Sequence, residues 1–292
     1  MFRGTFTALV TPFRNGAIDF PALEKLIEAQ IGAGIDGLIA IGTTGETPTL
    51  SHDERLEVIR FTVEKTKKRC LVFAGTGSYS TRDAIAATKG AQRLGADAAL
   101  VVAPYYNKPS QEGLFRHFEA IAQATDLRVM LYNIPGRCGI DIAAATVARL
   151  AKSCANIVSI KEASGSVDRV SELRGMLPDA FTILSGDDGL TLPFMAVGAV
   201  GVVSVASNLL PKEIVELVRA FAGGDARLAQ KLHRKLHPLF KDLFIEPNPV
   251  PVKTALAWRG AMTAEVRLPL CEMTEANCQR LRKTLDDFER AS

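Results

Sequence analysis

One lysine stands at the end of a short apolar, β-branched run of residues. The run from Ile157 to Lys161 is followed by Glu162 and then by small residues up to Gly165. If the run is a buried strand, the Lys161 ammonium needs either a polar cavity or the loss of its proton. An uncharged amine held there can attack a carbonyl carbon and form a Schiff base. The alternative is a lysine that reaches from the strand end into water, and taken by itself the stretch favours that alternative.

Other polar side chains follow apolar runs of the same kind. Gly42-Thr43-Thr44-Gly45 comes after one run, and its glycines permit a tight turn whose backbone N–H groups can bind a phosphate or a carboxylate. Arg137 follows another run and has a planar guanidinium suited to a carboxylate. Each signal also has an ordinary structural explanation, namely a plain turn and a solvated loop arginine.

Three tyrosines stand near the ends of these runs. Tyr132 ends one run, so its hydroxyl can lie in a shared cavity and relay protons, although core packing with a satisfied hydroxyl would also explain it. Tyr105 and Tyr106 lie in a loop bounded by prolines, where an exposed aromatic pair suggests contact with another subunit. Glu162 is placed to orient its neighbours, but a salt bridge at the strand end is the simpler expectation.

Eight continuous apolar runs predict eight parallel strands. A run without alternation is typical of a strand buried on both faces, and a helical pattern follows each run, at about 20 to 35 residues per unit. The predicted strands are 4–10, 37–42, 70–74, 98–103, 128–132, 157–161, 181–184 and 199–205. The predicted helices are 19–32, one capped by Ser51 with Glu54, 80–94, 111–124, 143–152, 167–177, 190–197 and 212–222.

Eight strand–helix units favour an α/β fold of the (β/α)₈ TIM barrel type over an open doubly wound sheet. The dinucleotide-binding pattern G-x-G-x-x-G is absent after the first strand, which argues against the open sheet. Further helices are expected at 225–244, 250–258 and 274–290. We therefore expect a catalytic barrel over residues 1–224 and a C-terminal helical extension over residues 225–292. Because active sites of such barrels lie where the strands end, the side chains above are expected to converge.

The composition narrows the class of protein. Of the 292 residues, 47% are hydrophobic, and the net charge of +3 comes from 35 basic and 32 acidic residues mixed along the chain. Without a basic block or an apolar run of membrane-spanning length, neither nucleic acid nor a membrane is an expected partner. Residues 1–12 lack a signal-peptide pattern, and five scattered cysteines without a C-x-x-C pair argue against a disulfide framework or a zinc site. The expected location is a reducing cytoplasm.

At the polar residues that follow the apolar runs, the chain resembles the pyruvate-dependent class I aldolase family. The resemblance extends over nearly the whole length of the chain. The resemblance rests on the segments 42–46, 132–137, 160–162, 185–188 and 249–253. It implies a lyase-type reaction through a lysine Schiff base with pyruvate. Within the family, the Thr-Thr pair and Arg137 resemble the synthases, which condense pyruvate with L-aspartate 4-semialdehyde on the route to diaminopimelate and lysine. The lyases of the family usually show Ser-Thr and lack that arginine.

The resemblance also implies roles for the residues that touch pyruvate. Lys161 would form the imine, and Thr43 and Thr44 would hold the pyruvate carboxylate, with Thr44 also in a proton relay. Tyr132 would move protons to and from the imine and the enamine. No metal or organic cofactor is expected, because the imine itself acts as the electron sink.

Four further positions receive roles from the same resemblance. Tyr106 would complete the relay from a neighbouring subunit, so the smallest active unit would be a dimer, and the family is usually a homotetramer built as a dimer of dimers. Arg137 would bind the carboxylate of the semialdehyde. Gly186 and Val203 would line the pyruvate pocket.

Many members of the family are inhibited by lysine at a site between subunits, and here the chain departs from their pattern. Residues 78–80 and Asp83 stand where inhibited members often have asparagine and glutamate, and Arg55 stands where many have histidine. His52 and Tyr105 are retained. Because the added guanidinium should repel the ammonium groups of lysine, the sequence predicts weak or no inhibition by lysine.

Two other functions remain open at this point. The same Schiff base on the same fold serves N-acetylneuraminate lyases and 2-keto-3-deoxy sugar acid aldolases, because a fold does not set the substrate. A barrel that binds a keto acid as a sensor or scaffold, without turnover, would be a different class of protein. The joint presence of Lys161, Tyr132, Tyr106 and both threonines counts against that class.

Overall fold

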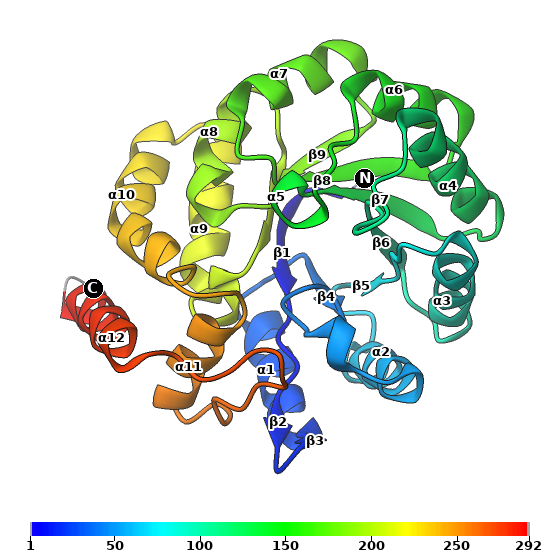
Figure 1. The fold of residues 1–292 in the computed structure, drawn as a ribbon. Helices are drawn as coiled ribbons and strands as arrows, with labels where there is room; N and C mark the ends of the chain where they lie inside the picture. Colours follow the sequence, from blue (N-terminus) through cyan, green and yellow to red (C-terminus); the bar gives the residue numbers. More distant parts are fainter. Residues whose placement is uncertain (1, 291–292) are drawn as a thin grey trace.

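The eight apolar runs pair side by side as parallel strands and close into a barrel, in the computed structural model, which describes residues 2–290 (Figure 1). The order around the barrel is β1-β10-β9-β8-β7-β6-β5-β4, and β4 closes on β1. The strands are β1 (Gly4–Ala8), β4 (Gly37–Ala40), β5 (Leu71–Gly75), β6 (Ala98–Val102), β7 (Arg128–Asn133), β8 (Ile157–Glu162), β9 (Thr182–Ser185) and β10 (Gly201–Ser204). The predicted TIM barrel is confirmed.

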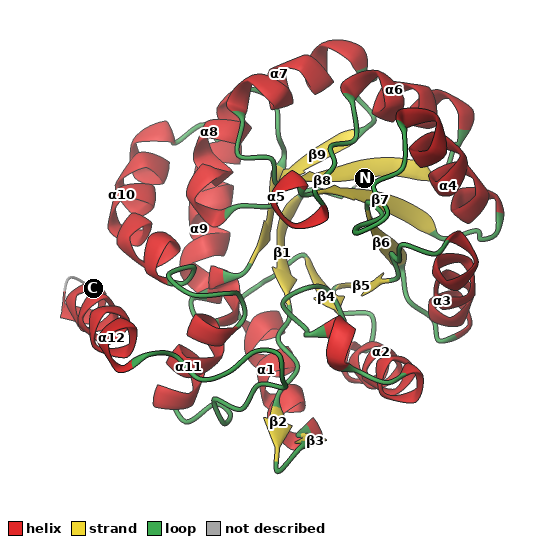
Figure 2. Ribbon diagram, in the orientation of Figure 1, coloured by secondary structure: helices red, strands yellow, loops and turns green. Residues whose placement is uncertain are grey.

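Helices surround the strands, as Figure 2 shows in red around yellow. The Asp19 side chain accepts a hydrogen bond from the Ala22 N–H and so caps the first helix, and the predicted capping box of Ser51 and Glu54 is present at the second. The surrounding helices are α1 (Phe20–Gly32), α2 (His52–Thr66), α3 (Thr81–Arg93), α4 (Gln111–Gln123), α6 (Ala144–Ser153), α7 (Val167–Met176), α8 (Thr191–Ala196) and α9 (Pro211–Ala222).

Several short elements were not predicted. They are the antiparallel hairpin β2 (Phe13–Arg14) and β3 (Ala17–Ile18), helix α5 (Pro135–Cys138), and the 3₁₀ turns η1 (Thr47–Thr49), η2 (Asp188–Leu190) and η3 (Ala206–Asn208). Two to four residues are too few to show a hydrophobic period. The consequence for the site is that Arg137, expected in a loop, lies in α5.

Three more helices follow the barrel, close to the expected bounds: α10 (Ala226–Asp242), α11 (Val250–Trp258) and α12 (Glu275–Arg290). Helix α10 packs against α9 and α12, and α11 packs against α12 and η3. The helices α10 to α12 therefore lie against one side of the barrel (Figure 1). The domain boundary expected after residue 224 stays a prediction, because helix α10, which follows it, packs directly against helix α9 of the barrel.

The register of two neighbouring strands places the lysine. In the pair β7 and β8, Tyr132 lies opposite Lys161, and Asn133 lies opposite Glu162. Side chains alternate between the two faces of a strand. Lys161 and Tyr132 therefore share one face at the carboxyl ends of these strands, and Asn133 and Glu162 share the other.

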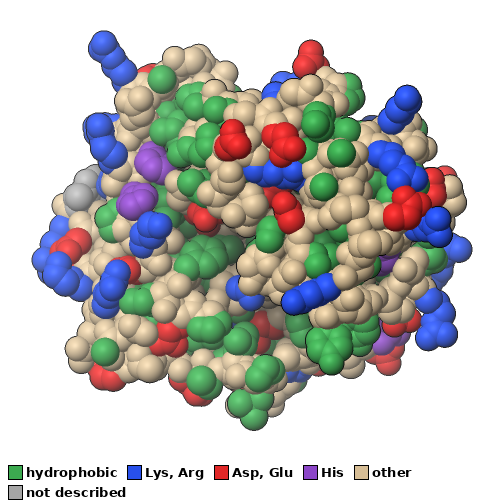
Figure 3. All heavy atoms as spheres, turned by 45° about the horizontal axis from the view of Figure 1, so that its top comes forward, with side chains coloured by type: hydrophobic (Ala, Val, Ile, Leu, Met, Phe, Trp, Pro, Cys, Tyr) green, Lys and Arg blue, Asp and Glu red, His purple; other side chains and the backbone are tan. Residues whose placement is uncertain are grey.

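The surface charges and the cysteines of the described residues do not indicate a second functional site. Basic and acidic side chains are interspersed over the face of the molecule in Figure 3. Within residues 2–290, the structure contains no helix with the length and apolar character that a membrane crossing requires. All five cysteines lie in the described residues and are free thiols.

Candidate active site

Lys161 is buried at the end of β8, with only 5% of its surface exposed. Its Nζ atom lies 4.2 Å from the centroid of the Tyr132 ring on β7. A cation gains some stabilisation over an aromatic face, but much less than it loses by leaving water. The location favours the neutral amine.

The pKa of Lys161 is lowered from 10.5 to about 7, chiefly because burial penalises the ammonium form. The carboxylate of Asp188 opposes this shift, and the Arg137 guanidinium adds to it. Near neutral pH a large share of the side chain is therefore an uncharged amine. The nucleophile that a Schiff base requires is present without a separate base to create it.

The hydroxyl of Tyr132 remains protonated over the whole working range. Burial raises its pKa, while the Arg137 guanidinium and the Thr43 side chain lower it by smaller amounts. A phenol of this kind can donate a proton to an oxygen leaving from a carbon attached to Lys161 and take one back. Of the two threonines, Thr43 is the one whose side chain interacts with Tyr132. Thr43 and Tyr132 both line a cavity of about 140 Å³.

Thr44 faces a different partner. Its side chain is 3% exposed, and its Oγ1 accepts a hydrogen bond of 2.9 Å from Nδ2 of Asn248, which precedes α11. The relay role predicted for Thr44 stays a prediction, and in the structure the threonine side chain that interacts with the Tyr132 phenol is that of Thr43. The hydroxyl of Thr43 thus interacts with Tyr132, and the hydroxyl of Thr44 interacts with Asn248.

The loop that carries both threonines is fixed by a buried ion pair. Nζ of Lys253 on α11 lies 2.6 Å from Oε1 of Glu46 and donates at 2.9 Å to the carbonyl oxygen of Thr11; neither side chain of the pair is exposed. The second carboxylate oxygen of Glu46 accepts from the Arg267 N–H at 3.0 Å. Buried charges are tolerated when they are paired and hydrogen-bonded like this, and breaking one partner is costly.

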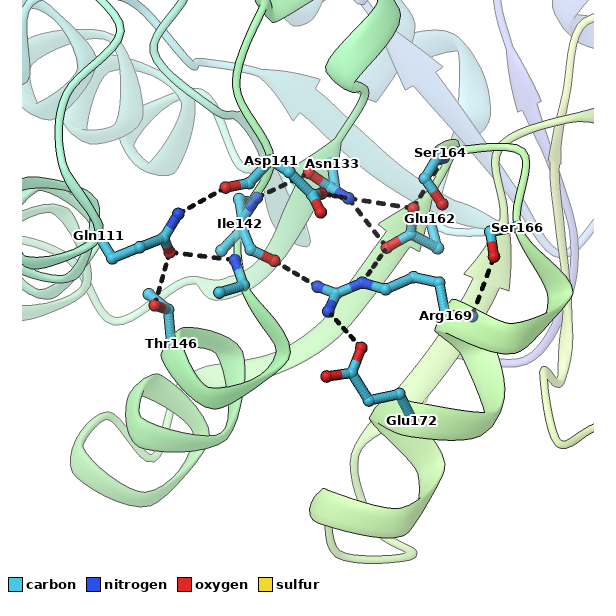
Figure 4. Close-up of polar contacts among 11 residues, drawn as sticks. Gln111, Asn133, Asp141, Ile142, Thr146, Glu162, Ser164, Ser166, Arg169 and Glu172 are labelled. Atoms are coloured by element: carbon cyan, nitrogen blue, oxygen red, sulfur yellow. Dashed lines mark hydrogen bonds and ion pairs between the residues drawn. The ribbon is translucent and has the colours of Figure 1, made fainter.

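A second buried network lies behind Lys161, on the outer face of β7 and β8 (Figure 4). Nδ2 of Asn133 donates to both oxygens of Glu162 at 3.1 Å and to Asp141 at 2.6 Å. Nε of Arg169 on α7 lies 3.6 Å from Glu162, so the predicted strand-end salt bridge is confirmed. The Ser164 N–H donates to the same carboxylate at 2.8 Å. These bonds clamp the strand ends that carry Tyr132 and Lys161.

Glycine at position 186 leaves room for the lysine. A Cβ atom there would lie 3.0 Å from Cε of Lys161 and 2.7 Å from Cβ of Ala163, which is too close for any other residue without movement. Val203 is buried on β10, one strand further along the barrel. The structure thus places Gly186 directly against the Lys161 side chain.

Asp188 is a site residue to which the sequence analysis assigned no role, although it lies in a motif that the analysis singled out. Its Oδ2 accepts from the N–H groups of Val205 and Ala206, both at 3.0 Å, so it joins the end of β9 to the end of β10. Its buried carboxylate is also the one that acts on Lys161. An aspartate three residues after a strand is also typical of a helix cap, so the sequence alone did not distinguish this role of Asp188.

Two predicted residues lie on the surface. Arg137 is exposed on α5, yet its charge affects the pKa values of both Lys161 and Tyr132, so it borders the site. Tyr106 is 91% exposed with a φ of +70°, whereas Tyr105 packs edge-on against Tyr79 at 5.3 Å between centroids. The structure brings Lys161, Tyr132 and Arg137 together, and it leaves Tyr106 pointing to solvent.

The chain is similar to known proteins over nearly its whole length. The model of the dihydrodipicolinate synthetase family matches residues 1–288. A 4-hydroxy-tetrahydrodipicolinate synthase from Endomicrobium trichonymphae is 53% identical, over 99% of this chain and 99% of that protein.

Two solved structures share both the fold and the sequence. The 4-hydroxy-tetrahydrodipicolinate synthase of Methylacidiphilum fumariolicum SolV is 57% identical with a TM-score of 0.99, over 99% of this chain and 97% of that one. The dihydrodipicolinate synthase of Aquifex aeolicus is 48% identical with a TM-score of 0.97, over 99% and 98% of the two chains. Matches of this length and identity leave no part of the barrel or of the helices α10 to α12 without a counterpart. The chain belongs to the dihydrodipicolinate synthetase family.

Proposed function

We propose that this chain is a lyase that condenses pyruvate with L-aspartate 4-semialdehyde to give 4-hydroxy-tetrahydrodipicolinate, a step toward diaminopimelate and lysine, with Lys161 as the Schiff-base residue. Full-length relatives at about 50% identity carry the name of this synthase. The observation that carries the residue assignment is the buried Lys161 amine, with its lowered pKa, against Tyr132. The sugar-acid lyase alternative is not favoured by these relatives.

The first chemical stage forms the imine. The Lys161 amine attacks the keto carbon of pyruvate, and Tyr132 protonates the oxygen that leaves as water. The methyl group of the bound pyruvate then loses a proton, which reaches Tyr132 by way of the Thr43 hydroxyl. The imine thereby becomes an enamine. The positive imine nitrogen is the electron sink for this step. The side chains of the site therefore have only to orient the substrate and to transfer protons.

The second stage makes a carbon–carbon bond. The enamine carbon attacks the aldehyde carbon of the semialdehyde, and the new alkoxide takes the proton that Tyr132 gained in the first stage and becomes the hydroxyl group. The amino group of the semialdehyde then attacks the imine carbon, which closes the ring and expels the Lys161 amine. The cyclic product explains why release of the enzyme needs no further water.

Each substrate brings a carboxylate that the site must hold. Thr43 and Thr44 lie at the end of β4, in a glycine-flanked turn whose N–H groups suit an anion, and we assign the pyruvate carboxylate to them. Arg137 borders the same site from α5, and we assign the semialdehyde carboxylate to its guanidinium. Val203, with Gly186, would line the pyruvate pocket.

We further propose that Tyr106 acts in the site of a second copy of this chain, in a dimer or a dimer of dimers. Its side chain is 91% exposed, in a backbone conformation that few non-glycine residues adopt. An aromatic side chain held out into solvent in this way suits a pocket on a partner. The free thiols suit a reducing cytoplasm, where we place the enzyme.

Replacing Arg137 with alanine is expected to separate the two substrates. Loss of a charge-assisted bidentate contact should raise the KM for the semialdehyde about a hundredfold and change the KM for pyruvate less than threefold. Steady-state kinetics with each substrate varied in turn measures both values. An equal loss for both substrates would contradict the assignment of Arg137, and Arg149, an exposed arginine on α6, provides a matched control variant.

The pH dependence should follow the amine. Because burial lowers the pKa of Lys161 to about 7, the nucleophilic fraction grows about tenfold for each pH unit below that value and levels off above it. The kcat/KM for pyruvate is expected to show the same limb. A limb near the ordinary lysine value of about 10.4 would show that Lys161 is not desolvated in the working enzyme.

Lysine is expected to inhibit this enzyme weakly or not at all. Arg55 lines a cavity of about 530 Å³ together with His52, Tyr79 and Asp83, so a cation stands where the ammonium groups of lysine would have to bind. A titration of turnover with L-lysine at saturating pyruvate checks this. Inhibition at submillimolar lysine would refute it, and an Arg55→His variant is expected to gain sensitivity.

A further inference from the structure

The segment before α11 supplies a residue to the site from far along the chain. We propose that Asn248 is a positioning residue, which directs the Thr44 hydroxyl proton at the carboxylate of pyruvate. This inference rests on the proposed function and deepens it, because it names the group that orients one of the two threonines. It also gives the C-terminal helices α10 to α12 a part in substrate binding.

The hydrogen bond between Asn248 and Thr44 has an ordinary length and is buried. Nδ2 of Asn248 lies 2.9 Å from Oγ1 of Thr44, across 204 positions of sequence. Asn248 is 7% exposed and Thr44 is 3% exposed. Water therefore competes little for either group, and in such a place a hydrogen bond sets orientation strongly.

The direction of this bond decides what Thr44 can do. A threonine hydroxyl has one proton, and an amide N–H can only donate. When Oγ1 accepts from Asn248, the hydroxyl keeps its own proton for another acceptor. A carboxylate is an acceptor only, so the chain runs from amide N–H to hydroxyl to substrate oxygen, and each bond polarises the next.

Neighbouring contacts hold both ends of the bond in place. Glu46, two residues after Thr44, is paired with Lys253, five residues after Asn248, at 2.6 Å. The Thr11 hydroxyl donates to the carbonyl oxygen of Gly45 at 2.8 Å. Because the two segments are joined twice, the orientation of Thr44 is set before substrate arrives, and little entropy is lost on binding.

Other buried asparagines of the chain show how a purely structural role looks. Asn208 uses both ends of its amide, donating to the Ala8 and Val205 carbonyl oxygens and accepting from the Val10 N–H. Asn248 bonds only to Thr44, and its Oδ1 is buried with no hydrogen-bond partner among the described residues. A buried amide whose one hydrogen bond goes to a threonine of the site is better explained by a role in substrate binding than by a role in holding the fold together.

The test compares Asn248→Ala, Asn248→Asp and Thr254→Val with the wild-type enzyme. Thr254 is a buried residue of α11 whose hydroxyl bonds only within its own helix, so it is the matched control. For each protein, borohydride trapping is titrated with pyruvate alone to find the half-saturating concentration. The KM for the semialdehyde is measured separately, and thermal melting verifies folding.

The two variants make different predictions. Asn248→Ala is expected to raise half-saturating pyruvate about tenfold, with the semialdehyde KM nearly unchanged. In Asn248→Asp the carboxylate accepts a hydrogen bond from the Thr44 hydroxyl and repels the substrate carboxylate, so the rise should be about a hundredfold near pH 8. Protonation of that carboxylate should reduce the ratio of variant to wild type as the pH falls toward 6. Using the ratio at each pH cancels the titration of Lys161.

The outcomes separate this inference from the proposed function. A wild-type adduct together with unchanged half-saturation in a folded Asn248→Ala variant would overturn the positioning role alone. Wild-type half-saturation by pyruvate in a folded Asn248→Asp variant near pH 8 would do so as well. Absence of any wild-type adduct would overturn the proposed function, and this inference with it. Thr254→Val behaving as wild type, with both Asn248 variants shifted as stated, supports the inference.

Discussion

Lys161→Ala is expected to reduce turnover by about four to six orders of magnitude, the scale seen when a covalent nucleophile is removed. No other side chain in the site can replace the amine. Tyr132 carries a phenol of raised pKa, and the other buried lysine, Lys253, is held by Glu46. The measurement is steady-state turnover with both substrates saturating, on protein free of wild-type contamination.

The same variant should fold at least as well as the wild type. In the native state the pKa of Lys161 is about 7, and in the unfolded chain it is the ordinary 10.5, so the unfolded state binds more protons between these values. The native state is therefore penalised for this lysine fully below about pH 7, and the penalty disappears as the pH rises toward 10.5. A lower melting temperature for Lys161→Ala at pH 6 would contradict the burial cost. Wild-type turnover in that variant would contradict the mechanism.

Tyr132→Phe is expected to lower kcat about a hundredfold to a thousandfold, the usual scale for losing a positioned acid–base group. The phenol ring stays, so the packing over Lys161 is kept. What is lost is the hydroxyl to which we assign protonation of the leaving oxygen and, with Thr43, receipt of the methyl proton. The melting temperature should change little, because the ring supplies nearly all of the buried surface.

Exchange of the pyruvate methyl protons with deuterated water isolates the proton step for Tyr132→Phe, because it needs the imine and the enamine but not the semialdehyde. We expect slow exchange, while trapping of the imine to completion is retained. Thr43→Val should show a smaller defect of the same kind. Fast exchange with a lowered kcat would move the role of Tyr132 to the carbon–carbon bond step instead.

Much of this fold could be predicted because its parts are regular. Continuous apolar runs such as Ala98–Val102 are what a strand buried on both faces requires, and each coincided with a strand to within a few residues. The cap at Ser51 could be predicted because a capping box is local. Helix α5 and the hairpin β2–β3 could not, since their few residues show no period and long-range packing decides their shape.

The positions of Lys161 and Tyr132 could be predicted because both end apolar runs of the sequence. In the structure they lie opposite each other near the carboxyl ends of β8 and β7. Asn248 did not follow, because its bond to Thr44 crosses 204 positions and the residues around it indicate only a turn. The division of work between Thr43 and Thr44 likewise depends on which direction each adjacent side chain points, and residue types alone do not give that.

The most direct test of the account is to reduce the enzyme with borohydride in the presence of pyruvate and to map the modified peptide. We expect one reduced pyruvyl group per chain, located on Lys161, in an enzyme that turns over when the semialdehyde is supplied instead of borohydride. Lys253, which is also buried but is paired with Glu46, should be unmodified. An adduct on another lysine, or no adduct at saturating pyruvate, would contradict the claim that Lys161 is the nucleophile around which this barrel is built.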